Sequence, residues 1–199
     1  MERDCQTMKN SCKTLGQAFR PTTSTHRTEK DAKLPTIEPQ KRVMGRSLNE
    51  VEYLTNNGSD DIPYGSLLIK QNLPRIKKIA ERLSPLHLTD DNWDAVCTIK
   101  DTLPPNGKKW SGLLMVENGF KRESICCEAE DGIKYAQNMK DCKHINFQGV
   151  YAFCGNTYEG NHAAVVTLRD ETIERLLNFL ITWVLLSVRH HKEEEHRKL

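Results

Sequence analysis

Apolar residues are most concentrated in one stretch near the end of the chain, Ile173–Val188. The polar residues in and around this stretch recur at steps of three, four or seven, so they share one narrow face of a helix. They are Glu171, Arg175, Asn178, Thr182 and Arg189. The thirteen residues between Arg175 and Arg189 would span about 20 Å as a helix, against roughly 30 Å of hydrocarbon in a bilayer. The pattern therefore predicts a buried core helix and not a membrane-spanning one.

Earlier segments carry separate helical signals. Ser47 is followed three residues later by Glu50, which is the spacing of a capping box. In residues 67–83 the apolar positions recur at helical steps, and Pro74 suits the first turn of a helix that begins near Asn72. Thr89 is a candidate cap for the next helix. The expected helices are Ser47–Leu54, Asn72–Leu83, Thr89–Leu103 and Glu128–Cys142.

The clearest strand signal is the pair Asn118-Gly119 between two apolar runs, Leu113–Glu117 and Phe120–Ile125. Two residues of this type favour a type I′ turn and a β-hairpin. Ile145–Cys154 and Ala163–Leu168 are two further expected strands. Hairpins imply an antiparallel sheet with helices on one face. The predicted fold class is therefore α+β, a small antiparallel sheet built from hairpins and packed against helices, including the buried C-terminal helix.

Composition divides the chain into segments. Residues 1–47 contain ten Lys or Arg and five Asp or Glu, a net charge of 10 − 5 = +5, with few large apolar residues. Such a segment cannot bury enough apolar surface to order itself. The sequence predicts a disordered, basic, threonine-rich arm in residues 1–47, a short helix and linker in 48–62, a single α+β domain in 63–191 and a charged tail in 192–199.

The seven cysteines are irregularly spaced, and no apolar leader follows Met1. Both features favour reduced thiols and a cytoplasmic location, with a nuclear location as the alternative.

Two cysteines and a histidine suggest nucleophilic chemistry. Cys126 and Cys127 stand where a strand is expected to give way to a helix, and His162 opens a predicted strand. A helix N-terminus lowers the pKa of a thiol, and an imidazole can take its proton. The string Asn161–Val166 resembles the histidine strand of papain-like enzymes, which implies a hydrolase with Cys127 as nucleophile and His162 as base. However, 35 residues separate the pair, and the sequence shows no orienting Asn or Asp.

The same region is rich in residues that bind zinc. Six cysteines and histidines lie within 37 residues: Cys126, Cys127, Cys142, His144, Cys154 and His162. The paired C-x₂-C spacing of zinc sites is missing. Zinc remains an alternative, and no other cofactor is expected.

One predicted helix has a basic face opposite its apolar face. Its residues are Lys70, Arg75, Lys77, Lys78 and Arg82. The face is either solvated or a surface for phosphate or lipid. Aromatic residues do not interleave with these charges, so stacking on nucleic-acid bases is not supported.

These features lead to three function classes. The first is a non-enzymatic protein-interaction or structural module, such as a cellular adaptor or a small viral matrix-like protein. Its protein partner is unknown, and it could form a homo-oligomer through a sheet edge or the final helix. The second is a cysteine-dependent hydrolase using Cys127 and His162. The third is a binder of nucleic acid or an anionic membrane through residues 1–47 and the basic face.

Overall fold

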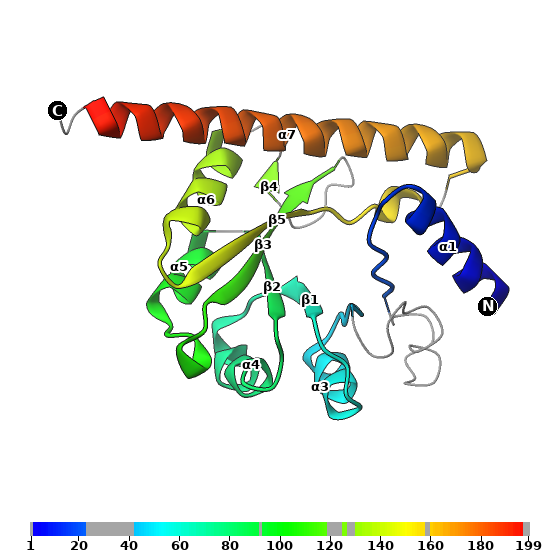
Figure 1. The fold of residues 1–199 in the computed structure, drawn as a ribbon, viewed down its shortest axis with the longest axis horizontal. Coiled ribbons are helices and arrows are strands. Elements are labelled where there is room, and N and C mark those ends of the chain that lie inside the picture. Colours follow the sequence, from blue (N-terminus) through cyan, green and yellow to red (C-terminus); the bar gives the residue numbers. More distant parts are fainter. Residues whose placement is uncertain are drawn as a thin grey trace. The chain divides into compact units, whose positions relative to one another are not determined.

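The computed structural model describes residues 2–22, 42–91, 93–118, 125–126, 130–157 and 160–196. The chain forms two compact units. Unit 1 comprises Met1–Thr89 and Leu103–Ser111, and unit 2 comprises Asp90–Thr102 and Gly112–Leu199. In both units strands alternate with helices along the chain (Figure 1).

Unit 1 is built around a parallel pair of strands. Its elements are α1 (Glu2–Thr14), α3 (Leu48–Asn56), β1 (Ile62–Leu67), a 3₁₀ turn (Lys70–Asn72), α4 (Leu73–Ala80), β2 (Leu86–Asp90, of which Asp90 belongs to unit 2) and a second 3₁₀ turn (Pro105–Gly107). Ile62 lies opposite Leu86 and Tyr64 lies opposite Leu88 in the parallel pairing of β1 with β2. Parallel strands need a crossover connection, and α4 supplies it.

Two helices of unit 1, α3 and α4, begin where the sequence predicts. At α3 the Glu50 backbone N–H donates to Ser47 Oγ at 3.2 Å, and the Ser47 backbone N–H donates to the Glu50 carboxylate at 3.3 Å. The capping box is therefore confirmed. Asn72 stands at the N-cap position of α4, and Pro74 lies in its first turn.

Unit 2 contains the remaining strands and the longest helix. Its elements are α5 (Trp93–Asp101), β3 (Trp110–Glu117, of which Trp110 and Ser111 belong to unit 1), β4 (Ile125–Cys126), α6 (Glu130–Asp141), β5 (Ile145–Tyr151), a 3₁₀ turn (Gly155–Thr157) and α7 (His162–His196). β3 pairs in parallel with β4 and also pairs with β5. A Cβ at Gly112 would lie 2.6 Å from Met139 Cε, so glycine allows α6 to approach β3.

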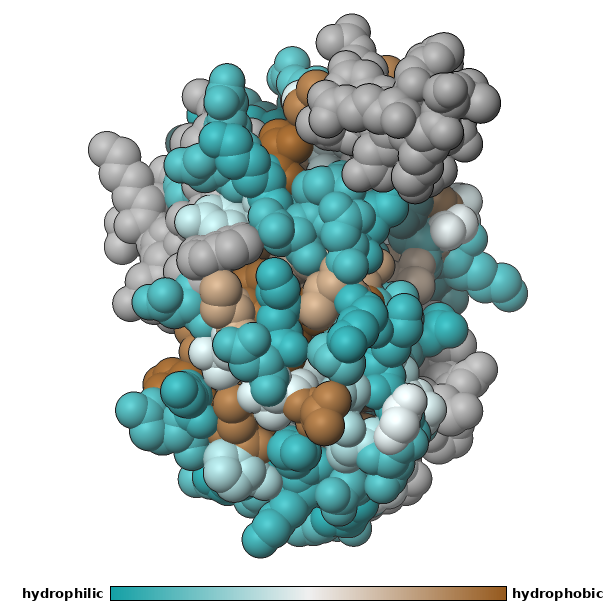
Figure 2. All heavy atoms as spheres, turned by 90° about the vertical axis from the view of Figure 1, so that its left-hand side faces the viewer, coloured by the Kyte–Doolittle hydropathy of each residue, from teal (hydrophilic) through white to brown (hydrophobic). Residues whose placement is uncertain are grey.

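Each unit buries its own apolar side chains. Fully buried residues of unit 1 are Val43, Val51, Ile62, Ile76, Leu83, Leu88 and Trp110, and those of unit 2 are Val96, Ile99, Leu114, Val116 and Met139. Hydrophilic residues cover most of the face shown in Figure 2, with apolar residues visible in small areas between them.

The structure contradicts the predicted antiparallel sheet. Val116 lies opposite Ile125 in a parallel pairing, so β3 and β4 do not form the expected hairpin. Asn118, expected in the turn of this hairpin, is buried. Gly119 and most of the second predicted hairpin strand lie outside the described residues. The α+β prediction fails because helices, and not tight turns, connect strands such as β1 and β2.

The strand predicted for Ala163–Leu168 is also wrong, because these residues lie in α7. Asn161 Oδ1 accepts a hydrogen bond from the Ala164 backbone N–H at 3.0 Å. This contact satisfies one of the free N–H groups of the first helical turn. The helix therefore starts at His162 and continues through the predicted strand.

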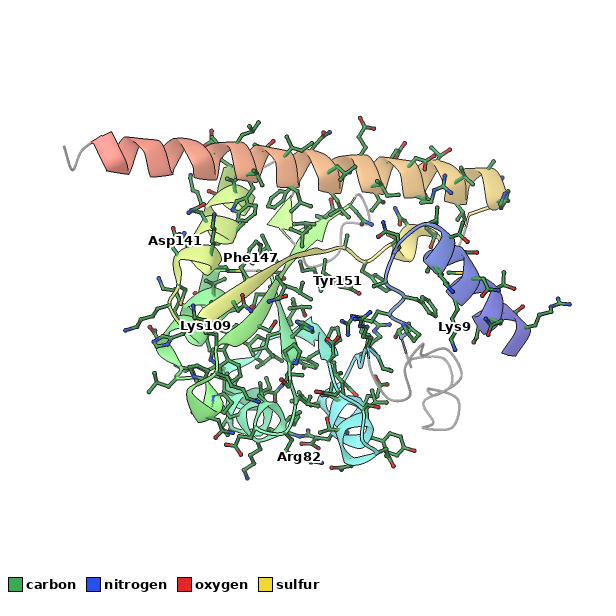
Figure 3. All side chains as sticks on the ribbon, in the orientation of Figure 1. Lys9, Arg82, Lys109, Asp141, Phe147 and Tyr151 are labelled. Atoms are coloured by element: carbon green, nitrogen blue, oxygen red, sulfur yellow. The ribbon has the colours of Figure 1, made fainter. Side chains whose placement is uncertain are left out.

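The C-terminal helix is buried on one side and exposed on the other. On the inner side Phe179 and Thr172 are buried, and the ring of Trp183 meets that of Phe147 edge-on at 5.3 Å (Figure 3 labels Phe147 on β5). On the outer face of α7, five large apolar residues are 48–59% exposed. They are Ile173, Leu177, Ile181, Val184 and Leu185. The prediction that the wide apolar side of this helix is buried in the core is therefore wrong for these five residues.

The predicted arm and tail are described in part. Within residues 1–47 the structure describes 2–22, which contain α1, and 42–47. Residues 23–41 and 197–199 lie outside the described residues, and the electrostatic role of the arm stays a prediction. Among the described helices, none combines the length and apolarity needed to cross a bilayer.

Candidate functional site

The predicted basic face on α4 is partly engaged within unit 1. The Arg75 side chain pairs with Glu52 on α3, with Nε 2.6 Å from Oε1. The hydrogen bond from Arg75 lowers the pKa of Glu52. Arg82 donates to Asn56 at 2.8 Å. Arg75 therefore connects α4 to α3, and Arg82 connects the segment after α4 to α3. Lys70, Lys77 and Lys78 complete the face, whose binding role stays a prediction.

The predicted cysteine and histidine sites are scattered or outside the described residues. His162 is exposed at the start of α7, and so it does not open a strand. Cys127 and the side chain of Cys126 are outside the described residues. Cys142 is buried, and His144 is half-buried. Among the described residues no three His, Cys, Asp or Glu side chains are grouped closely enough to hold a metal ion. The Cys127–His162 pair and the zinc set remain predictions.

A serine, a histidine and an aspartate meet in unit 1. His87 Nδ1 lies 2.7 Å from Ser111 Oγ, and His87 Nε2 lies 2.7 Å from Asp61 Oδ1. A carboxylate can only accept, so Nε2 donates to Asp61 and Nδ1 accepts from the Ser111 hydroxyl. Arg20 Nη2 also donates to Asp61 Oδ1 at 2.9 Å. The network joins the segment after α1 to the strands.

This network has the residue types of a serine hydrolase but not its accessibility. Ser111 and His87 are both buried. Each is the second residue of its strand, and Asp61 directly precedes β1, so the network lies at the amino ends of the strands. Parallel sheets bind ligands at the opposite, carboxyl ends. The network is therefore a structural connection.

The pKa values in this network favour a neutral histidine. Burial lowers the pKa of His87 by more than the contact with Asp61 raises it. Burial alone would raise the pKa of Asp61, but the hydrogen bonds from His87 and Arg20 outweigh it and lower that pKa. The contribution of His87 to stability should therefore decrease as the pH drops below about 6.5, where an unfolded histidine takes up a proton.

Asp90 is the most unusual ionisable group in the described part of the chain. It ends β2, and its side chain is completely buried. Neither carboxyl oxygen has a hydrogen-bond partner among the described residues. Burial, with a smaller contribution from the charge of Asp91, raises the pKa of Asp90 to about 7. A buried polar group without a partner costs stability, so it indicates a functional position.

A second buried polar group follows the carboxyl end of β3. Asn118 Nδ2 donates to Cys154 Sγ at 3.3 Å and contacts Thr172 Oγ1 of α7 at 3.5 Å. Asn118 and Thr172 are both buried. Asp90 and Asn118 belong to unit 2, and each stands at the carboxyl end of a strand. These strand ends are the candidate functional site.

Sequence reasoning missed this site because it assigned both positions to other elements. Asp90 was predicted in the first turn of a helix, where an acid needs no special explanation, and Asn118 in a turn. The available signal was the order of residues. The apolar run Leu86–Leu88 ends in Thr89-Asp90-Asp91, as a buried parallel strand ends in polar residues at its carboxyl end.

Comparison with solved structures defines the fold class. An alanine racemase-like protein from Idiomarina loihiensis has a TM-score of 0.80 and 19% identity, over 91% of this chain and 48% of that one. D-threo-3-hydroxyaspartate dehydratase from Delftia sp. HT23 has a TM-score of 0.81 and 18% identity, over 91% of this chain and 49% of that one. The chain has the alanine racemase-like, TIM-barrel-type fold over about half the length of these neighbours.

Two sequences similar to this chain belong to D-serine dehydratases. The enzyme of Saccharomyces cerevisiae is 25% identical over 182 residues, covering 79% of this chain and 42% of the enzyme. The enzyme of Schizosaccharomyces pombe is 24% identical over 166 residues, covering 79% and 40%. The chain thus spans about two fifths of the length of these relatives. No protein-family model matches it.

These comparisons correct the predicted function. The similar proteins are dehydratases, so the prediction of a non-enzymatic interaction or structural module is contradicted. They also agree with the position of the site, because TIM barrels carry active sites at the carboxyl ends of their strands and stabilising contacts at the amino ends.

Proposed function

We propose that this chain forms part of a dehydratase that acts on D-serine or a related small D-3-hydroxy amino acid, with a cytoplasmic location. The similarity to two D-serine dehydratases and the fold shared with D-threo-3-hydroxyaspartate dehydratase support the proposal. The observation that supports the proposal most strongly is the position of Asp90. Its buried carboxyl group lies at the carboxyl end of β2 and has no hydrogen-bond partner among the described residues.

The chemistry of such a reaction suits this carboxyl group. Dehydration of a 3-hydroxy amino acid requires removal of the hydrogen on the α-carbon and a proton for the leaving hydroxyl group. A group transfers protons most effectively when its pKa lies near the working pH. Asp90, with a pKa of about 7, is present in both protonation states near neutrality. It can therefore donate a hydrogen bond to a ligand or accept one from it.

The described residues do not fit the cofactor that this reaction class calls for. Pyridoxal phosphate supplies an electron sink for the carbanion of an amino acid, and a lysine holds it as a Schiff base. Such a lysine would be needed at the carboxyl end of a strand. Asp90 ends β2 and Asn118 follows β3, and neither is a lysine. Lys70 follows β1 but is exposed. We therefore assign no step to this cofactor.

Turnover of D-serine tests the proposal. Dehydration of serine yields pyruvate and ammonia, and pyruvate can be followed through NADH oxidation by added lactate dehydrogenase. We expect the purified chain to form pyruvate from D-serine and not from L-serine, and samples with and without added pyridoxal phosphate show whether the cofactor is required. The same samples should be analysed for conversion of D-alanine to L-alanine, because the fold is similar to that of alanine racemase.

The outcomes separate the two activities. Pyruvate from D-serine, or a 2-oxo acid from D-threo-3-hydroxyaspartate, supports the dehydratase. L-Alanine without pyruvate indicates a racemase instead. The absence of a 2-oxo acid from both hydroxy amino acids, in protein that circular dichroism finds folded, contradicts the proposal.

A further inference from the structure

The carboxyl ends of the described strands lack the lysine that would hold pyridoxal phosphate. The last residues of β1, β2, β3, β4 and β5 are Leu67, Asp90, Glu117, Cys126 and Tyr151. Every lysine side chain that the structure describes is at least partly exposed. A lysine that forms a Schiff base must be unprotonated, and burial is a usual means of lowering its pKa. The described residues therefore offer no candidate for this role.

Two strands end in acidic residues that belong to unit 2. β2 ends in Asp90 and is followed by Asp91, and β3 ends in Glu117. The charge of Asp91 acts on Asp90, so these two carboxyl groups lie close enough to interact. A phosphate monoester carries about two negative charges near neutral pH, so carboxylates repel it, whereas they attract a cation. The ligand that suits these strand ends is therefore positively charged.

Asp90 lacks the partner that a buried carboxylate needs. Its side chain is completely buried, and neither oxygen has a hydrogen-bond partner in the part of the chain that the structure describes. A buried charge is stable only when it is paired and hydrogen-bonded. The protonated amino group of an amino acid meets both needs, because an ammonium group has a positive charge and three N–H donors. An amine that is bound in a Schiff base keeps at most one of these donors.

We infer that this chain binds its amino acid in the free ammonium form, with the ammonium group paired to the Asp90 carboxylate, and that this binding does not require pyridoxal phosphate. The inference rests on the proposed function for the choice of ligand, which is D-serine or a related D-3-hydroxy amino acid. It concerns binding alone and does not depend on how the hydroxyl group is eliminated.

Binding of the ammonium group should release a proton from Asp90. The carboxyl group is mostly protonated below its pKa of about 7, whereas pairing with a cation favours the carboxylate. Calorimetry at pH 6 in two buffers with different ionisation enthalpies should therefore give a release of about one proton per bound ligand. The affinity should rise about tenfold from pH 6 to pH 8, because the ionised fraction of Asp90 rises by that factor.

Titration of the purified full chain with D-serine tests the inference. The protein is first dialysed against hydroxylamine, which removes any pyridoxal phosphate. We expect D-serine to bind without added cofactor. D-Glycerate, which has a hydroxyl group in place of the ammonium group, should not bind measurably. Asp90→Asn should weaken the binding of D-serine at least about tenfold, because a neutral amide does not attract the ammonium charge.

Asp131→Asn is the matched control for this substitution. Asp131 lies on α6 in the same unit, and its side chain is 72% exposed. The variant also loses one carboxylate, but it should bind D-serine like the parent chain. Circular dichroism establishes whether both variants are folded. If Asp90→Asn is not, the comparison of D-serine with D-glycerate decides, because it uses the parent chain.

The outcomes separate this inference from the proposed function. Binding of D-serine without cofactor and without pyruvate formation supports the inference and contradicts the dehydratase. Pyruvate formation in which D-serine binds only after pyridoxal phosphate is added supports the dehydratase and overturns the inference. It is also overturned if neither D-serine nor D-threo-3-hydroxyaspartate binds, if D-glycerate binds as tightly as D-serine, or if folded Asp90→Asn keeps the affinity of the parent chain.

Discussion

Replacing Asp90 with Asn should remove most of the loss of stability that Asp90 causes in the parent chain as the pH rises from 4 to 8. The pKa of Asp90 is raised from 3.8 to about 7 in the folded state. Between these values the folded chain keeps a proton that the unfolded chain releases, so stability falls as the pH rises. Three pKa units at about 1.4 kcal/mol each give about 4 kcal/mol. Urea unfolding at several pH values measures this difference.

The neighbouring acid provides the control for this experiment. Asp91→Asn removes one charge next to Asp90, which is the smaller cause of the raised pKa, and leaves the burial of Asp90 unchanged. It should keep most of the pH dependence. The comparison uses slopes with pH, because Asn at position 90 also changes the stability at every pH. Equal slopes for Asp90→Asn and the parent chain would show that Asp90 is not a buried acid.

Two substitutions on opposite sides of α7 should have very different effects. Phe179 is 2% exposed, whereas Ile181 is 56% exposed. Phe179→Ala removes a buried ring and should lower the free energy of unfolding by about 3–5 kcal/mol. Ile181→Ala should change it by less than about 0.5 kcal/mol when the chain is monomeric. Urea unfolding of dilute protein, followed by circular dichroism, measures both.

This pair of variants tests which side of the helix faces the core. The stability data must be collected at a concentration where light scattering gives the monomer mass, so that association does not contribute. Similar losses for both variants would mean that both of these sides of α7 are buried, as the sequence pattern predicted. A larger loss for Ile181→Ala would reverse the assignment of inner and outer faces.

The sequence predicted well the features that depend on neighbouring residues. Ser47 and Glu50 form the expected capping box, and α4 begins at the Asn72–Pro74 signal. These signals concern backbone N–H groups within one helical turn, so they do not depend on the rest of the fold. The helix α6 and the strand β5 were found for a similar reason, since each has its own apolar periodicity.

Features that depend on distant residues were predicted less well. β1 contains Pro63 and Gly65, residue types that usually interrupt strands, yet Pro63 lies opposite His87 in a parallel pair. β2 has five residues, too few for a clear period. The direction in which two strands pair depends on the tertiary structure. The pair Asn118-Gly119 gave a strong local signal for antiparallel pairing, whereas β3 and β4 pair in parallel.

The C-terminal helix shows the same limit. Ile173–Val188 has apolar residues on two sides, and periodicity alone cannot say which side meets the core. Phe179 and Ile181 are two residues apart and equally apolar in the sequence, but their exposures differ widely. The functional site was missed for a related reason: Asp90 becomes unusual only when the strand that it ends is known to be parallel and buried.

The central claim is that Asp90 marks a ligand site at the carboxyl end of β2, and its own titration tests this most directly. In protein with ¹³C-labelled aspartate carboxyl groups, assigned with Asp90→Asn, the signal of Asp90 should titrate with a pKa of about 7. Saturating D-serine should lower that pKa, because hydrogen bonds donated by a ligand favour the charged carboxylate. A titration near 3.8, or one that D-serine leaves unchanged, would contradict the account.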